Sequence, residues 1–400
     1  MNKLILKISQ NQNLSLFIIY LLWLISLAVY FLFSEFIKAG ALKDGVNYGA
    51  DSIFYLKESR NIINGDISIL KYKGYFGYLL FLTPFLYFEL PLYYVVLFQV
   101  VLTAISAFCL YKITEKFFCK SSGLICVFIF LLYFPLQLRN FYILTEMLFV
   151  DITIILVFFI VFFKKNYLVP TVFLLFFLIS IRPNGILFLF SIFISFFIYI
   201  IFNKKYLYLS FYLIILLFAS IPIIIFLNSY LDELNLIKVL NKGIIWGYSF
   251  ETNQICLSSC LSVDLINNNF SNNLSGYFQF ISINYIEYFK IFFLKIFWFI
   301  LRARPYYSDL HNFYILFFNI VLYSSCVYGF IKKPKNLFSI NCIIIYMLLS
   351  MVLVGLTFAD WSGRFSLYIL PLIMIFSSYG ILFFVKKIFK MIKQKRNYTS

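Results

Sequence analysis

Long apolar runs separated by short polar segments dominate the chain. Ten of these runs approach the roughly 20 residues that a helix needs to cross a bilayer, and they lie near 14–33, 91–111, 123–138, 143–163, 168–181, 185–202, 206–228, 312–331, 338–358 and 365–385. Runs of this kind favour helices over the alternating segments of about ten residues that form outer-membrane barrels. The pattern predicts an all-α fold, a polytopic bundle of about ten transmembrane helices that makes residues 1–400 a single integral membrane domain.

Composition points to the same class of protein. The chain is 63% hydrophobic and only 12% charged, whereas a globular domain has about 25% charged residues. A soluble enzyme, a nucleic-acid-binding protein and a disordered scaffold are therefore excluded. Most of the seven cysteines lie in apolar runs, and Cys256 and Cys260 alone share a polar loop, either as a disulfide or as two free thiols. The cysteines and the single His311 have no zinc-type spacing, so no metal ligands are assigned.

The basic residues predict the orientation in the membrane. Clusters at 3–7, 112–120, 164–165, 204–205, 332–335 and 386–396 hold 18 of the 33 Lys and Arg residues together with one acid, Glu115. All of them fall on one side if the weaker apolar stretches 74–90 and 289–301 do not cross the membrane. By the positive-inside rule that side is cytoplasmic. Both termini, including the basic tail 386–400, are then cytoplasmic, and the bias toward Phe, Ile, Lys and Asn is typical of an AT-rich bacterium, which implies the inner (plasma) membrane.

Two long loops are left on the outer, periplasmic face. The first covers 34–73 and leads into the re-entrant or interfacial segment 74–90, and the second covers 229–311 and includes an interfacial helix at 289–301. Asp51 lies among aromatic residues of the first loop, where a polar substrate could meet a lipid-borne one. The alternative is an ordinary solvated loop acid.

Several charged residues lie at the outer ends of predicted helices. Glu146 and Asp151 fall at the end and in the body of one span, where ionisable groups usually face the bundle interior; a structural partner for them, such as Arg182 or a tyrosine, is the alternative to a functional role. Arg182 and Arg364 each lie in a tight outer turn, and Arg302, Arg304 and His311 form a further cationic cluster. Guanidinium groups suit bidentate binding of phosphate, although they also snorkel to headgroups without binding a ligand.

The order of these features resembles the GT-C superfamily of membrane glycosyltransferases, within it the family of protein O-mannosyltransferases and lipid A aminoarabinose transferases. The resemblance covers about 14–385 and rests on loose motifs: Asp51-x-x-x-Tyr55 followed by Gly65, Gly74-Tyr75-Phe76-Gly77-Tyr78, Thr145-Glu146, Ile181-Arg182-Pro183-Asn184-Gly185, and Arg364 followed by Pro371. Many members have two adjacent acids in the first loop, whereas Ser52 follows Asp51 here.

The resemblance implies inverting transfer of a sugar from a polyprenyl-phosphate donor to a lipid, glycan or protein acceptor at the periplasmic face. Asp51 would be the catalytic base, and Arg364, Arg182, Arg302, Tyr55 and Glu146 would bind substrate or carrier phosphate. This interpretation assigns no certain cofactor. It leaves the requirement for a divalent metal undecided, since a single Asp is a poor metal site. The partners are these substrates and membrane lipids, and nucleic acid is not among them.

A polysaccharide polymerase, or a flippase or transporter of lipid-linked sugars, is the competing interpretation. Such proteins have similar numbers of spans and a large outer loop. Transporters often carry inverted repeats and broken helices, and the span pattern shows no duplication.

Overall fold

The computed structural model describes residues 12–37, 46, 48–66, 73–204, 240, 245–247, 265–266, 270–271, 273–304, 307–331, 337–357, 359–360 and 363–399. Over these residues the chain is almost entirely helical, which confirms the all-α prediction. A two-residue parallel pair, β1 (Trp246–Gly247) with β2 (Ala359–Asp360), is the exception within that part. The predicted span at 206–228 and the Cys256–Cys260 pair lie outside the described residues.

Six of the described helices include a stretch long and apolar enough to cross a membrane, which indicates a membrane-embedded protein. These are α2 (Gln12–Ile37), α5 (Tyr93–Phe117), α10 (Ile186–Phe202, preceded by the 3-10 turn η5, Pro183–Gly185), α16 (Asp309–Ile331), α17 (Leu337–Leu356) and α18 (Leu370–Thr399). The expected number of about ten spans is not confirmed.

The number of long apolar helices is lower than expected mainly because of the segment between residues 120 and 181. The run 123–138 is divided at Tyr133 into α6 (Lys120–Leu132) and α7 (Phe134–Gln137) with η3 (Leu138–Phe141), and the two parts meet at 61°. Pro135 lies in the first turn of α7. Proline has no N–H with which to continue the hydrogen bonds of α6, but it is tolerated in the first turn of a new helix. The next helices, α8 (Thr145–Val161) and α9 (Leu168–Ile181, preceded by η4, Lys165–Tyr167), have 17 and 14 residues.

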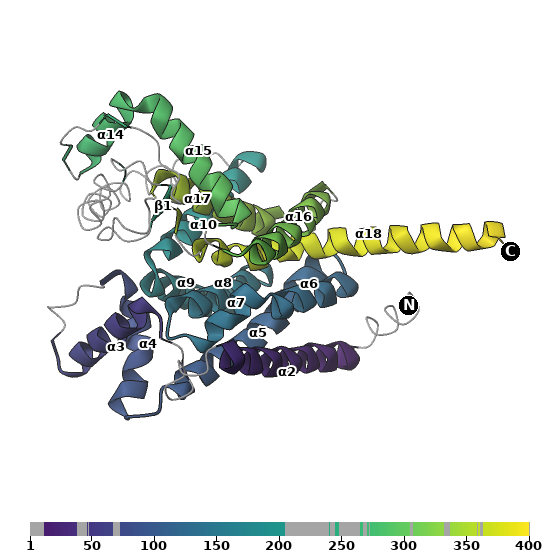
Figure 1. Ribbon diagram of the computed structural model, residues 1–400, viewed down its shortest axis with the longest axis horizontal. Helices are drawn as coiled ribbons and strands as arrows, with labels where there is room; N and C mark the ends of the chain where they lie inside the picture. Colours follow the sequence, from purple (N-terminus) through teal and green to yellow (C-terminus); the bar gives the residue numbers. More distant parts are fainter. Residues whose placement is uncertain are drawn as a thin grey trace. The chain divides into compact units, whose positions relative to one another are not determined.

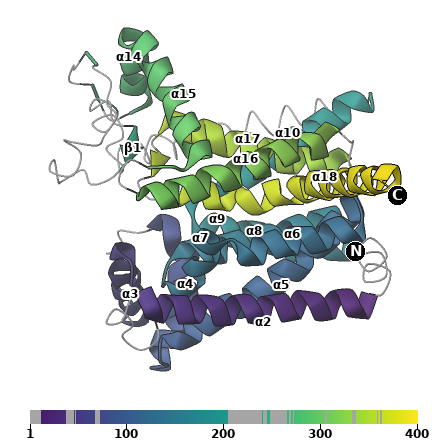
Figure 2. The ribbon, with the colours of Figure 1, turned by 45° about the vertical axis from the view of Figure 1, so that its right-hand side comes forward.

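The chain divides into two compact units. The first unit comprises 1–189, 320–343 and 367–400, and the second comprises 190–319 and 344–366. In the first unit α5 packs against α6 and α8, and α18 packs against α6 (Figures 1 and 2). Two short helices, α3 (Ala50–Ile63) and α4 (Phe76–Tyr87, preceded by η2, Lys73–Tyr75), lie side by side, and α4 also contacts α9.

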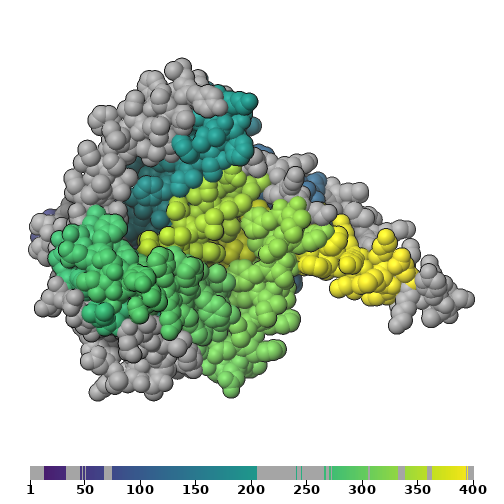
Figure 3. Space-filling model, turned by 90° about the horizontal axis from the view of Figure 1, so that it is seen from above, coloured from purple at the N-terminus to yellow at the C-terminus, as the bar shows by residue number. Residues whose placement is uncertain are grey.

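The second unit contains the consecutive helices α14 (Leu274–Ile283) and α15 (Tyr285–Leu301), which meet at an angle at Asn284 and form one continuous surface in Figure 3. Leu240, Phe280 and Tyr288 make its small buried core. Asn273 caps α14 by accepting the Gly276 N–H at 2.9 Å, and the hydroxyls of Tyr277 and Tyr288 lie 2.5 Å apart. Burial raises the pKa of both tyrosines, so these hydroxyls stay protonated.

Candidate functional site

A buried ion pair lies where α8 begins and α9 ends in the first unit. Glu146, in the first turn of α8, and Arg182, which ends α9, have Oε1 and Nη1 at 3.4 Å, and their exposed fractions are 1% and 6%. The same Nη1 donates a hydrogen bond of 2.7 Å to Thr145 Oγ1. The structure thus brings together two residues that the sequence had singled out separately, and Arg182 is one of the partners left open for Glu146.

Aromatic rings surround this guanidinium. Arg182 lies over the rings of Tyr75 at 5.6 Å and Tyr368 at 5.0 Å, geometry in which a cation is attracted to the ring face. The ring of Tyr55 is 5.6 Å from Tyr75 and 5.2 Å from Tyr78. Burial raises the pKa of Tyr55, so it is a neutral phenol. Tyr55, Tyr75, Tyr78 and Tyr368 thus line the ion pair, and these four rings are called the tyrosine wall below.

Two glycines allow the helices of this site to approach one another. A Cβ on Gly77 of α4 would lie 2.1 Å from Ser180 Oγ and 2.8 Å from the Ser180 carbonyl carbon in α9. A Cβ on Gly74 would lie 2.8 Å from Pro183 Cγ. The two motifs that the sequence placed in order along the chain are thus packed together, and this contact positions Tyr75 beside Arg182.

Asp51 lies on α3, whose start is fixed to the segment before α8. The Ser52 hydroxyl accepts from the Gly49 N–H and donates to the Ile143 carbonyl, both at 2.8 Å, and the Leu144 side chain packs against Gly49. Asp51 is partly exposed, one helical turn before the buried Tyr55. Side chains four residues apart are neighbours on a helix, so Asp51 borders the tyrosine wall from the solvent side.

A second cluster, in the second unit, contains three guanidinium-bearing residues. Arg302 ends α15 in a left-handed conformation (φ 61°), and Arg304 donates through Nη1 to the carbonyls of Trp298 and Ala303 at 3.0 and 2.9 Å. Both are buried. Gly363, also left-handed (φ 68°), would place a Cβ 3.9 Å from Arg302 Nε and Arg304 Nη2, and Arg364 follows it directly.

Two further basic residues of the second unit, His311 and Lys295, have defined contacts. His311 stacks on Tyr307 with ring centroids 4.4 Å apart. Lys295 of α15 is buried, donates to the Thr357 carbonyl at 2.6 Å, and burial lowers its pKa to about 7. The carbonyl partner of Lys295 is 62 residues away in sequence, so the sequence alone could not reveal this contact.

Asp151 lies in a separate polar cluster of the first unit, one that the sequence analysis did not anticipate. Its Oδ2 is 3.1 Å from Thr103 Oγ1, which is also 3.0 Å from Asn140 Oδ1. Thr103 has one hydroxyl proton, so it cannot donate to both oxygens. The Gln99 carbonyl, 3.1 Å from Thr103 Oγ1, is a further acceptor for the same proton. A protonated Asp151 that donates to Thr103 relieves one of these competing contacts and leaves the Thr103 proton for Asn140 or Gln99, while Asn140 Nδ2 donates to Gln137 Oε1 at 3.1 Å.

The placement of the expected site residues follows from these contacts. Asp51, Tyr55, Glu146 and Arg182 lie in the first unit, and Arg302 and Arg364 lie in the second.

Among the described residues, no three His, Cys, Asp or Glu side chains are grouped so that they could hold a metal ion. No protein-family model matches the chain, and no curated protein matches it.

Proposed function

We propose that this protein is a membrane glycosyltransferase of the GT-C kind, which moves a sugar from a polyprenyl-phosphate donor to a lipid, glycan or protein acceptor. The observation that carries the proposal is the grouping of Asp51 with Tyr55, Glu146 and Arg182, residues from loosely spaced motifs that are up to 131 positions apart and still form one cluster. A partly exposed carboxylate beside a buried, charge-neutral wall suits a base that meets a polar acceptor at the rim of a membrane domain.

In this mechanism Asp51 accepts the proton of the acceptor hydroxyl as its oxygen attacks the anomeric carbon. Such general-base assistance contributes about 10²–10⁴-fold in rate. Arg182 is engaged by Glu146, Thr145 and two tyrosine rings. We therefore assign it to positioning of the wall rather than to direct phosphate binding.

We keep Arg302 and Arg364, which lie in the second unit with Arg304, as the residues that would bind the carrier phosphate, because guanidinium groups suit phosphate recognition. The negative charge on that phosphate grows in the transition state, so fixed guanidiniums bind it more strongly there than in the ground state.

We place the reaction at the periplasmic face of a bacterial inner membrane, with both termini in the cytoplasm, because the basic clusters all fall on one side when neither 74–90 nor 289–301 crosses. The 12-residue length of α4 supports this, since it is too short to span. A cysteine at residue 48 should react with an impermeant thiol reagent added outside, and one at 388 should not. The reverse labelling would refute the orientation.

Asp51→Asn tests the catalytic claim, because the change is nearly isosteric and removes the proton acceptor. In purified, reconstituted protein, transfer from a polyprenyl-phosphate sugar should slow by about 10²–10⁴-fold with donor binding little changed. Asp66→Asn is the matched control, an exposed acid just after the same helix. Full transfer by Asp51→Asn would refute the site. A parent protein that moves lipid-linked sugar across vesicles without transferring it would favour the flippase instead.

A further inference from the structure

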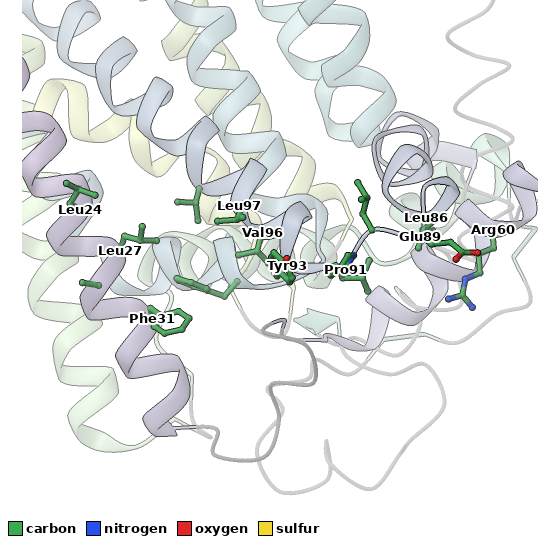
Figure 4. Close-up of a pocket in the computed structure, with 15 residues that line it drawn as sticks. Leu24, Leu27, Phe31, Arg60, Leu86, Glu89, Pro91, Tyr93, Val96 and Leu97 are labelled. Carbon is green, nitrogen blue, oxygen red and sulfur yellow. The ribbon is translucent and has the colours of Figure 1, made fainter.

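A large apolar groove lies in the first unit, away from the buried ion pair. It has a volume of about 1420 Å³ and is bordered by α2, by the turn between α4 and α5, and by the start of α5 (Figure 4). Small-molecule sites usually have about 300–1,000 Å³, so this groove is large enough for a ligand with long chains.

Among the described residues that line the groove, the charged ones lie at one end. Leu24, Leu27 and Phe31 of α2 lie at one end of the row, and Arg60 and Glu89 lie at the other (Figure 4). Arg60 and Glu89 are the one base and the one acid in this described part of the lining. Both side chains are exposed, and within the described part of the chain they form no ion pair with each other or with another residue. A ligand of this groove would therefore be apolar over most of its length, with both a negative and a positive group at one end.

Glu89 occupies a backbone position that would normally be glycine. It follows the end of α4 with φ 52°; its N–H bonds to the Leu86 carbonyl and the next N–H, of Leu90, bonds to the Phe85 carbonyl. This is the Schellman arrangement, in which the left-handed residue is usually glycine, because a side chain is strained there. Strained residues cluster at ligand-binding positions, and the strain at Glu89 places a carboxylate at the mouth of the groove.

We propose that this groove binds a zwitterionic phospholipid with a primary amine, of the phosphatidylethanolamine class. Its acyl chains lie along the apolar walls, its phosphate contacts the Arg60 guanidinium, and its ammonium donates hydrogen bonds to the Glu89 carboxylate. A purely anionic lipid would pair with Arg60 but would bring a negative headgroup to Glu89. A choline headgroup carries the positive charge without an N–H, so it cannot donate to Glu89.

The test measures binding of three lipids with the same dioleoyl chains to the full-length, delipidated protein, by native mass spectrometry from detergent. Phosphatidylethanolamine should bind about tenfold more tightly than phosphatidylglycerol or phosphatidylcholine, the factor expected for one additional charge-assisted hydrogen bond. Equal affinity for the three headgroups would overturn the proposal, and so would a preference for phosphatidylglycerol.

Variants separate headgroup recognition from folding. Arg60→Gln should weaken phosphatidylethanolamine and phosphatidylglycerol alike, whereas Glu89→Gln should reduce only phosphatidylethanolamine, to the level of the other lipids. Glu89→Gly removes the same carboxylate but relieves the backbone strain, so it should lose the preference without a fall in melting temperature. Lys57→Gln and Asp66→Asn, exposed residues outside the groove lining, should keep it. If Glu89→Gly retains the preference, Glu89 is not the ammonium partner and the proposal fails.

Discussion

Replacing Glu146 with glutamine removes one charge from the buried pair and leaves the shape of the side chain almost unchanged. At the 3.4 Å separation of Oε1 and Nη1, two unit charges attract by about 5 kcal/mol at an effective dielectric constant near 20. The side chain of Arg182 is buried, so water cannot replace the lost carboxylate. Breaking one partner of a buried pair typically costs about 3–5 kcal/mol, and we expect Glu146→Gln to lower the free energy of unfolding by that amount.

The assay is equilibrium unfolding in mixed micelles, followed by the circular dichroism of the helices. Arg182→Met should also be strongly destabilising, but the double variant should cost clearly less than the sum of the two, with an interaction free energy of about 2 kcal/mol or more. Asp66→Asn serves as a control, an exposed acid just after α3 and outside the ion pair. A Glu146→Gln protein within about 0.5 kcal/mol of the parent would refute the pairing as the central contact of the first unit.

Three further changes have defined outcomes. Gly77→Ala should destabilise by about 2 kcal/mol or more in the same unfolding assay, because its Cβ would overlap Ser180. Asp151→Asn should cost less than about 1 kcal/mol, because an amide N–H can donate to Thr103 as the protonated acid does; a cost above about 3 kcal/mol would show that the carboxylate is ionised. Burial lowers the pKa of Lys295 to about 7 from an ordinary 10.5. Between these two pH values the unfolded chain binds more protons than the folded one, so the free energy of unfolding should rise with pH across that window. Lys295→Met should remove this dependence of stability on pH.

The class of fold could be predicted from composition and run length, because an apolar excess of this size can be buried only in a bilayer, and apolar runs of about 20 residues there form helices rather than barrel strands. The number of long helices could not. Hydropathy measures how far an apolar run extends, and it does not detect a break inside the run. The run 123–138 is interrupted at Tyr133. The other two runs, 143–163 and 168–181, correspond closely to α8 and α9, but these helices have 17 and 14 residues and are shorter than the long candidate spans.

The candidate site could be predicted in part. Glu146 and Arg182 were recognisable as charges within apolar sequence, where an ionisable group is expensive unless it has a partner. The role of Thr103 was not recognisable, since a threonine in an apolar helix is unremarkable and its contact Asp151 is 48 residues away. The left-handed position of Glu89 was not recognisable, because no glycine lies between α4 and Pro91 and only about a third to a half of helices end on a left-handed residue.

The two arginine sites differ in a way that bears on the chemistry they can support. In the first unit the positive charge of Arg182 is balanced by Glu146 at 3.4 Å and spread against tyrosine rings. An added phosphate there would have to compete with a carboxylate already in place. In the second unit Arg302 and Arg304 lie near Gly363, whose Cβ would be 3.9 Å from Arg302 Nε and Arg304 Nη2, and Arg304 Nη1 donates to two backbone carbonyls. Anion binding uses charge-assisted hydrogen-bond donors, and the charge of Arg182 is already matched by Glu146, so this pair is better suited to holding the tyrosine rings in place than to binding a phosphate.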